Sequence, residues 1–261
     1  MGRKYSTSSD SNISGINSIV SNFDFCKDPI ELYPLSFLQS RYEKKYITSR
    51  DQFISLINNK KIQNAYSIGF NSKFTKYNNQ YYDLENYYLY IIHHNGKKNR
   101  FKIRTRYYEN SKGTFELNYK NNRNLMTKNR FPLLEGENPL LKYGKEISSI
   151  TKYNSNLLYE SLKTQYYRIT LFNRNSPERV TIDTNLIFSG EVEKRLNDIF
   201  IIEIKTDFYS NRSVFNNILK EMKIQSIPFS KYCIGISLTN SKIKKNNFKP
   251  IMNRINKIME N

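Results

Sequence analysis

A strict alternation of basic and other side chains over residues 100–106 (Arg-Phe-Lys-Ile-Arg-Thr-Arg) constrains the fold more than any other part of the sequence. Alternate residues of a β-strand lie on the same face of its sheet, so Arg100, Lys102, Arg104 and Arg106 would share one face of a single strand. Four like charges side by side repel one another. A strand of this kind therefore needs either water along its basic face or a bound polyanion.

The same alternation recurs in other segments, where acidic residues join the basic ones. Several strands with charged faces are explained together if they line one enclosed interior that holds a polyanion and a cation. A basic stripe exposed to water is the alternative. The residues that would share a strand face are Glu43 with Lys45, Glu116 with Asn118 and Lys120, Arg179 with Thr181 and Asp183, and Glu203 with Lys205.

Glu203 interrupts an otherwise apolar run, Ile-Phe-Ile-Ile-Glu-Ile-Lys over residues 199–205. A buried carboxylate is costly unless it is paired or binds a metal, so Glu203 needs a partner. An ion pair with a lysine inside the protein is one possibility. Carboxylates together with phosphate oxygens are also the ligands that Mg²⁺ and Mn²⁺ prefer, and we therefore predict a metal at Glu203.

The overall charge is strongly positive, +19 from 42 Lys and Arg against 23 Asp and Glu. Such a protein attracts nucleic acid, anionic lipid or a phosphorylated substrate. The two cysteines, Cys26 and Cys233, indicate neither a disulfide framework nor a zinc site. No apolar run approaches the roughly 18 residues of a membrane-spanning helix. We expect a cytoplasmic protein, with peripheral attachment at the inner face of a membrane left open.

The chain is expected to form one domain over residues 35–261, preceded by an arm over residues 1–34. The arm is rich in Ser, Asn and Asp, so we expect it to be flexible or loosely docked and exclude it from the core. The pattern favours an α+β fold, mainly antiparallel β, with a barrel and helices packed outside. Strands are predicted over residues 41–47, 65–70, 87–93, 99–108, 114–120, 165–172, 179–188, 198–205 and 231–238, and helices at 49–57, within an insert at 121–163, and near 213–222.

Seven short segments occur in one order between about Arg41 and the C-terminus, and through them the sequence resembles a known family. They are residues 41–46, 102–107, 115–117, 167–168, 179–183, 202–205 and 229–233. The family is the VTC domain, the polyphosphate polymerase module of the triphosphate tunnel metalloenzyme superfamily, in its short microbial form. No single segment is specific, but seven in order are.

The resemblance implies an eight-stranded, closed antiparallel tunnel with helices outside it. It implies transfer of the γ-phosphate of ATP onto polyphosphate with Mn²⁺ or Mg²⁺, or hydrolysis of a triphosphate in relatives. The catalytic cations would be Lys45, Arg104, Arg106, Arg168, Arg179, Lys205 and Lys231, further phosphate contacts Ser230, Lys102, Lys120, Lys128 and Arg130, and metal ligands Glu203 with Glu43 and Glu116 as additional carboxylates.

One position departs from the family pattern, which usually has Lys where this chain has Asn118. Lys120, on the same predicted strand face, is a substitute; loss of turnover in a polyphosphate-binding protein is the alternative. An RNA 5′-triphosphatase of the same superfamily would be expected to carry two Glu in each metal-binding strand. Here Glu43 and Glu203 each lack a second Glu at the alternate position of their strand. A nucleic-acid binder would not explain Glu203. We expect ATP and polyphosphate or tripolyphosphate as partners, no specific nucleic acid, and any membrane channel as a separate protein.

Overall fold

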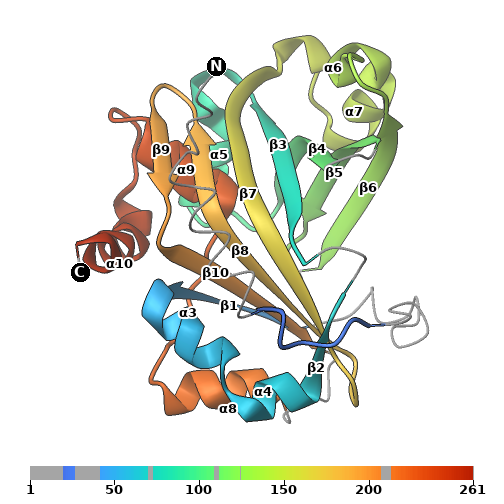
Figure 1. Ribbon diagram of the computed structural model, residues 1–261. Helices are drawn as coiled ribbons and strands as arrows, with labels where there is room; N and C mark the ends of the chain where they lie inside the picture. The colour runs from blue at the N-terminus through green and yellow to red at the C-terminus, as the bar shows by residue number, and fades with distance from the viewer. Residues whose placement is uncertain are drawn as a thin grey trace, which may run out of the picture.

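The computed structural model describes residues 20–26, 42–69, 73–108, 112–123, 125–206 and 213–260. Within these residues, one strongly curved antiparallel sheet of ten strands forms the centre of the molecule (Figure 1). Eight strands follow one another in the order β1-β10-β8-β7-β3-β4-β5-β6, while β2 pairs with β7 and β9 pairs with β8. The strands are β1 Tyr42–Ser49, β2 Tyr66–Ile68, β3 Thr75–Asp83, β4 Arg100–Tyr108, β5 Gly113–Lys120, β6 Met126–Leu133, β7 Tyr159–Asn173, β8 Glu178–Ser189, β9 Glu193–Leu196 and β10 Ile199–Thr206.

Helices lie on both faces of this sheet. One group packs below the sheet in Figure 1 and another lies beside β4 to β6. The helices are α3 Arg50–Ile57, α4 Lys60–Ala65, α5 Tyr88–His94, α6 Pro139–Lys142, α7 Gly144–Thr151, α8 Val214–Glu221, α9 Lys231–Thr239 and α10 Lys249–Met259, with 3₁₀ turns at Glu85–Tyr87, Ser155–Leu157 and Asn246–Phe248. None of the helices in the described part of the chain is both long and apolar enough to cross a bilayer.

Helix α3 begins where the sequence predicts it, at a capping box. The hydroxyl of Ser49 accepts a hydrogen bond from the backbone N–H of Gln52 at 3.3 Å, and the side chain of Gln52 accepts one from the N–H of Ser49 at 3.1 Å. These bonds satisfy N–H groups that the first turn of a helix leaves unpaired. Phe53 of α3 then stacks on Phe200 of β10, with ring centroids 4.1 Å apart.

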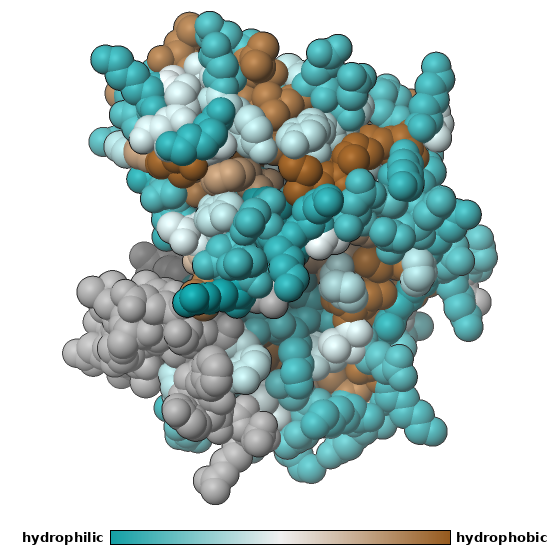
Figure 2. Space-filling model, turned by 180° about the vertical axis from the view of Figure 1, so that it is seen from behind, coloured by the Kyte–Doolittle hydropathy of each residue, from teal (hydrophilic) through white to brown (hydrophobic). Residues whose placement is uncertain are grey.

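The convex face of the sheet is apolar and covered by helices. Helices α3, α4 and α8 cover β1, β10, β8 and β7, while α7 covers β4 and β5 through residues such as Ile103, Phe115 and Ile147. The other residues of these strands, including Arg104 and Glu203, therefore face the concave side. This arrangement confirms the predicted alternation. It confirms the packing of helices outside the sheet for these helices but not for α9, which packs on the concave side against Tyr81 and Leu162. From behind, apolar surface appears only in patches broken up by hydrophilic residues (Figure 2).

The predicted closed barrel of eight strands is not what the sheet forms. Ten strands take part, and the two ends of the strand order, β1 and β6, are not paired with each other in the described residues. Their charges nevertheless act across the opening, because Lys128 on β6 helps to lower the pKa of Glu43 on β1. Closure depends on how curvature accumulates over all strands, which the alternation within one strand does not specify.

Part of the predicted arm packs into the core. Val20 and Phe23 are buried in the same apolar cluster as Phe53, and the N–H of Cys26 donates to the carbonyl of Ile68 at 2.7 Å. The exclusion of the arm from the core was therefore wrong for Val20 and Phe23. Residues 1–19 and 27–34 lie outside the described residues, and their assignment to an arm stays a prediction.

Two segments predicted as strands are helices instead, namely 87–93 (α5) and 231–238 (α9). Helix α9 is buried on nearly every side, so it lacks the polar face that gives a surface helix its 3.6-residue period. Gly235 permits this packing, because a Cβ there would lie 2.5 Å from Cδ2 of Leu162 on β7 and 2.7 Å from Cδ1 of Phe188 on β8. The predicted helical insert at 121–163 contains α6 and α7, but also β6 and the start of β7.

Candidate functional site

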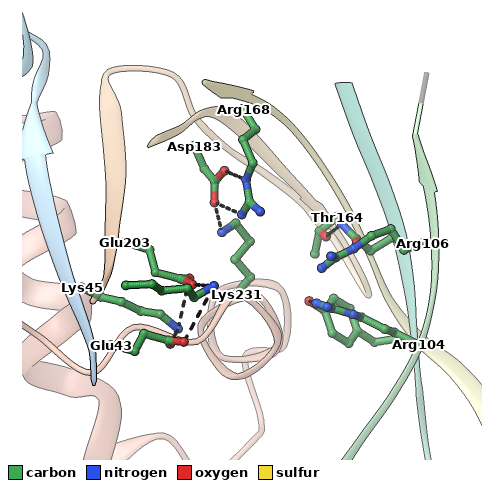
Figure 3. A network of polar contacts seen from close by, with 12 residues as sticks. Glu43, Lys45, Arg104, Arg106, Thr164, Arg168, Asp183, Glu203 and Lys231 are labelled. Carbon is green, nitrogen blue, oxygen red and sulfur yellow. Dashed lines mark hydrogen bonds and ion pairs between the residues drawn. The ribbon is translucent and has the colours of Figure 1, made fainter. Parts of the chain in front are cut away.

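The concave face gathers the charged side chains of seven strands opposite one another. On one wall, the registers of β1, β10 and β8 align Glu43, Lys205 and Arg179 in one row, and Lys45, Glu203 and Thr181 in the next. On the other wall, β4, β5 and β6 align Lys102, Asn118 and Lys128, then Arg104, Glu116 and Arg130. Figure 3 shows side chains from both walls pointing into one central space.

Two carboxylates and two ammonium groups interleave on the first wall. Glu203 contacts Lys205 through one oxygen and lies 3.7 Å from Nζ of Lys45 through the other. Glu43 lies 2.8 Å from Nζ of Lys45 and 3.9 Å from Nζ of Lys205. Burial would raise the pKa of Glu43, but the two ammonium groups outweigh it and lower that pKa to about 2. The lysine pairing considered for Glu203 is thus present.

Arg168, Asp183 and Lys231 form a second cluster, which joins β7, β8 and α9. Asp183 is 1% exposed and accepts hydrogen bonds from Arg168, and Lys231 contacts one of its oxygens. Burial would raise the pKa of Asp183, but both cations outweigh it and hold that pKa well below its ordinary value. Arg168 also lies over the ring of Tyr77, 4.8 Å from its centroid, and Lys231 lies 4.6 Å from that of Tyr166.

Glu116 on β5 is the centre of a third cluster. Its Oε2 lies 2.6 Å from Nη2 and 2.7 Å from Nε of Arg104. Its Oε1 lies 3.4 Å from Nε of Arg130 and 3.9 Å from Nη1 of Arg106. The carboxylate is 2% exposed; burial would raise its pKa, but Arg104 and Arg106 lower it to about 2. Glu116 therefore stays ionised and holds the arginines in place.

The N-terminus of α9 brings two more predicted contacts into the same space. Ser230 caps the helix, since its hydroxyl accepts from the N–H of Cys233 at 3.3 Å, and Lys102 on β4 donates to that hydroxyl at 3.1 Å. Lys231 follows as the first helical residue. A helix N-terminus carries partial positive charge, so it adds to the attraction of this space for anions.

A site of this kind is suited to a chain of phosphates, and sequence comparison agrees. Residues 40–240 match the VTC domain. The chain belongs to this family. Membership supports a protein that acts on triphosphate or polyphosphate, with a divalent metal of the kind that the tunnel superfamily generally uses. No curated protein matches the chain.

Solved structures resemble this VTC domain only distantly. A protein from Bacillus halodurans, named as a candidate adenylate cyclase, is 17% identical with a TM-score of 0.48, over 74% of this chain and 94% of its own. A Hippeastrum protein, named as a candidate adenylyl cyclase with a dominant triphosphatase activity, is 13% identical with a TM-score of 0.46, over 77% and 97%. A Pyrococcus horikoshii protein is 15% identical with a TM-score of 0.44, over 78% and 99%. These likenesses are too distant to indicate a substrate or a reaction.

The VTC domain brings its sequence-predicted site residues to one face, with different degrees of enclosure. Arg104, Arg106, Arg168, Lys205 and Lys231 are largely buried, whereas Arg130 on the edge strand β6 is 59% exposed. Lys120 lies opposite Arg100 in the register of β4 and β5, and burial together with the charge of Arg100 lowers the pKa of Lys120. Sequence reasoning missed Asp183 as a site residue. The alternation that puts Asp183 on the same strand face as Arg179 and Thr181 could have identified it as a site residue.

Asn118, the departure from the family pattern, lies between Lys102 and Lys128 in the register of β4, β5 and β6. Its amide nitrogen donates to Oε2 of Glu116 at 3.2 Å, and its buried oxygen has no hydrogen-bond partner in the described residues. The side chain thus supports Glu116 and supplies no positive charge. Lys120 lies two residues further along the same face, close enough to Glu43 and Lys45 for their charges to act on it.

Glu43 and Glu203 of this VTC domain fit a hard divalent cation better than Glu116 does. Both contact the same two lysines, so their oxygens lie near one another, and the hydroxyl of Thr181, in register with Glu203, is buried without a partner in the described residues. Mg²⁺ commonly takes one or two carboxylates and completes its shell with phosphate oxygens and water. No group of three or more His, Cys, Asp or Glu suited to a metal occurs among the described residues, so phosphate would have to supply ligands.

Proposed function

We propose that this VTC domain is a polyphosphate polymerase that transfers the γ-phosphate of ATP onto a growing polyphosphate chain. The observation that carries the proposal is the convergence of cations from both walls and from α9 on one concave space, where buried carboxylates hold them apart (Figure 3). A phosphate chain carries negative charge at every unit, and it can replace these carboxylates as the counter-charge of several cations at once.

The cations would hold the acceptor chain in line with the γ-phosphate of ATP. In the transfer, the bond from the γ-phosphorus to the βγ-bridging oxygen breaks, a terminal oxygen of the chain bonds to that phosphorus, and ADP leaves. Positioning and charge stabilisation account for most of the catalysis of such reactions, and no covalent intermediate on the protein is needed. Forked guanidinium groups, such as those of Arg104 and Arg168, suit phosphate oxygens.

Glu203 and Glu43 would hold Mn²⁺ or Mg²⁺, which, when bound, neutralises charge on the phosphate oxygens. Lys45 and Lys205, which contact these carboxylates in the structure, would then turn to the phosphates. The two lysines thus have two sets of partners, carboxylates without substrate and phosphates with it. The role of a separate membrane partner and the cytoplasmic location both stay predictions.

The proposal is tested by incubating the protein with ATP and Mn²⁺ or Mg²⁺ and measuring polyphosphate, ADP and free phosphate separately. A polymerase yields ADP and polyphosphate in step, with little free phosphate. Free phosphate without polyphosphate would support a triphosphate or polyphosphate hydrolase instead. Binding of tripolyphosphate without turnover would support a non-catalytic binder, which the uncharged Asn118 favours as second candidate.

A further inference from the structure

Tyr81 of β3 is a buried tyrosine inside the charged space that no part of the proposed mechanism uses. It is 3% exposed and lies in register with Arg104 on β4 and Leu162 on β7. Its ring stacks on Tyr232 of α9, with centroids 5.1 Å apart, and its backbone carbonyl accepts a hydrogen bond from the hydroxyl of Ser161 at 3.2 Å. The stacking holds the ring and the hydrogen bond holds the backbone of β3 at this residue, and together they fix the place of the hydroxyl.

The hydroxyl of Tyr81 can still donate a hydrogen bond. Its oxygen accepts a hydrogen bond from Nη1 of Arg104 at 3.2 Å, and no acceptor for its own hydrogen is recorded among the described residues. Buried hydroxyls normally have such an acceptor, because leaving a buried polar group unpaired costs free energy. Elsewhere in this protein, buried tyrosines do donate: Tyr66 to Glu178 and Tyr232 to Asp83.

The surroundings of this hydroxyl attract negative charge. Burial alone would raise the pKa of Tyr81, but Arg104, Arg106 and Lys231 together lower it below the ordinary value. A more acidic phenol is a stronger hydrogen-bond donor to an anion. The other hydrogen-bonding groups of Arg104, Nε and Nη2, are directed at Glu116, so Arg104 links the tyrosine to the carboxylate that a substrate would compete with.

We propose that the hydroxyl of Tyr81 donates a hydrogen bond to an oxygen of the phosphate unit that Arg104 binds. Tyr81 is then a neutral residue that contacts phosphate within a set of cations. This inference rests on the proposed function only in requiring that a phosphate chain occupies this space. The contact adds no charge to an already strongly positive wall. The hydrogen bond favours a ligand that has an acceptor oxygen at this one position, and long-range electrostatic attraction alone cannot provide that selectivity.

The test compares Tyr81→Phe with Tyr82→Phe. Tyr82 is the next residue of the strand, is equally buried, and packs on the opposite face near Phe115, so the second variant removes a buried tyrosine hydroxyl away from the site. Tripolyphosphate binding is measured by calorimetry without ATP. The dissociation constant should rise about tenfold in Tyr81→Phe, as expected for loss of one hydrogen bond to a charged group, and change little in Tyr82→Phe.

A second readout separates a phosphate contact from a structural role. Tripolyphosphate affinity should fall in both proteins as pH is raised, because Lys102 and Lys205, whose pKa values burial lowers, lose their charge. It should fall more steeply in the wild type than in Tyr81→Phe as the pKa of Tyr81 is approached, since the phenolate cannot donate. Equal affinity of wild type and Tyr81→Phe, or equal losses in both variants, would overturn the inference while leaving the proposed function intact. A wild type that binds no tripolyphosphate would overturn both.

Discussion

The guanidinium of Arg168 and the carboxylate of Asp183 form a two-pronged ion pair, with Nε 2.6 Å from Oδ1 and Nη2 2.8 Å from Oδ2. Arg168 lies on β7 and Asp183 faces it on β8, so the pair spans the middle of the sheet. Lys231 of α9 contacts the same carboxylate. One buried carboxylate therefore positions two predicted phosphate contacts that come from distant parts of the chain.

Replacing Asp183 by Asn should lower turnover at least tenfold without weakening tripolyphosphate binding. The amide keeps the shape but loses the charge that holds Arg168 and Lys231, whereas the space as a whole becomes more positive. Because two buried cations lose their partner, the free energy of unfolding without ligand should fall by about 3 kcal/mol. Steady-state kinetics, calorimetry and urea unfolding measure the three effects. Unchanged turnover would show that Asp183 does not position these cations for catalysis.

Removing Arg104 and Arg106 together should weaken tripolyphosphate binding tenfold or more, because both guanidinium groups lie in the enclosed space. The matched control removes Lys242 and Lys244, which are exposed in the segment before α10 and carry the same total charge. Binding is measured at two salt concentrations. Similar losses in both double variants, fading at high salt, would indicate a diffuse positive surface in place of a specific site.

Replacing Glu203 by Gln should abolish metal-dependent turnover and preserve the fold. The amide is a poor ligand for Mn²⁺ and Mg²⁺, and it leaves Lys45 and Lys205 with Glu43 as their remaining carboxylate partner in this cluster. Tripolyphosphate binding without metal should therefore persist, while its enhancement by Mn²⁺ should disappear. Glu193→Gln on β9, where the carboxylate is 48% exposed, is the control. Full metal-dependent activity in Glu203→Gln would remove Glu203 from the metal site.

His93 should make the protein less stable in mild acid. Burial and the neighbouring Lys102 lower its pKa to about 2, and its Nε2 lies 2.9 Å from the carbonyl oxygen of Phe101, to which the neutral ring donates. Below its ordinary pKa of about 6.5, the unfolded chain binds a proton that the folded His93 does not, so stability falls as pH falls from about 6.5 toward 2.

The variant His93→Gln retains a donor for Phe101 and removes this titration. From about pH 7 to about pH 5, its free energy of unfolding should fall by about 2 kcal/mol less than that of the wild type. Urea unfolding at both pH values measures the difference. Parallel losses in the two proteins would mean that His93 binds its proton equally well in the folded and unfolded states.

The sequence by itself determined which residues face the same side of a strand. Residues 100–106 alternate because one side of β4 packs against α7 and the other faces the charged space, and a period of two is visible without any partner strand. The short capping motif at Ser49 likewise determined the start of α3, because its hydrogen bonds involve only neighbouring residues. Both features depend on local geometry.

Tertiary structure decided the identity of elements buried on all sides and the partners of the charges. Helix α9 has no polar face, so its apolar sequence fits a strand as well as a helix, and only packing between β7, β8 and α5 selects the helix. Asp183 meets Arg168 because of the register of β7 and β8, and meets Lys231 because α9 lies against them. Such pairings depend on distances between segments far apart in the chain, and periodicity within one segment carries no information about them.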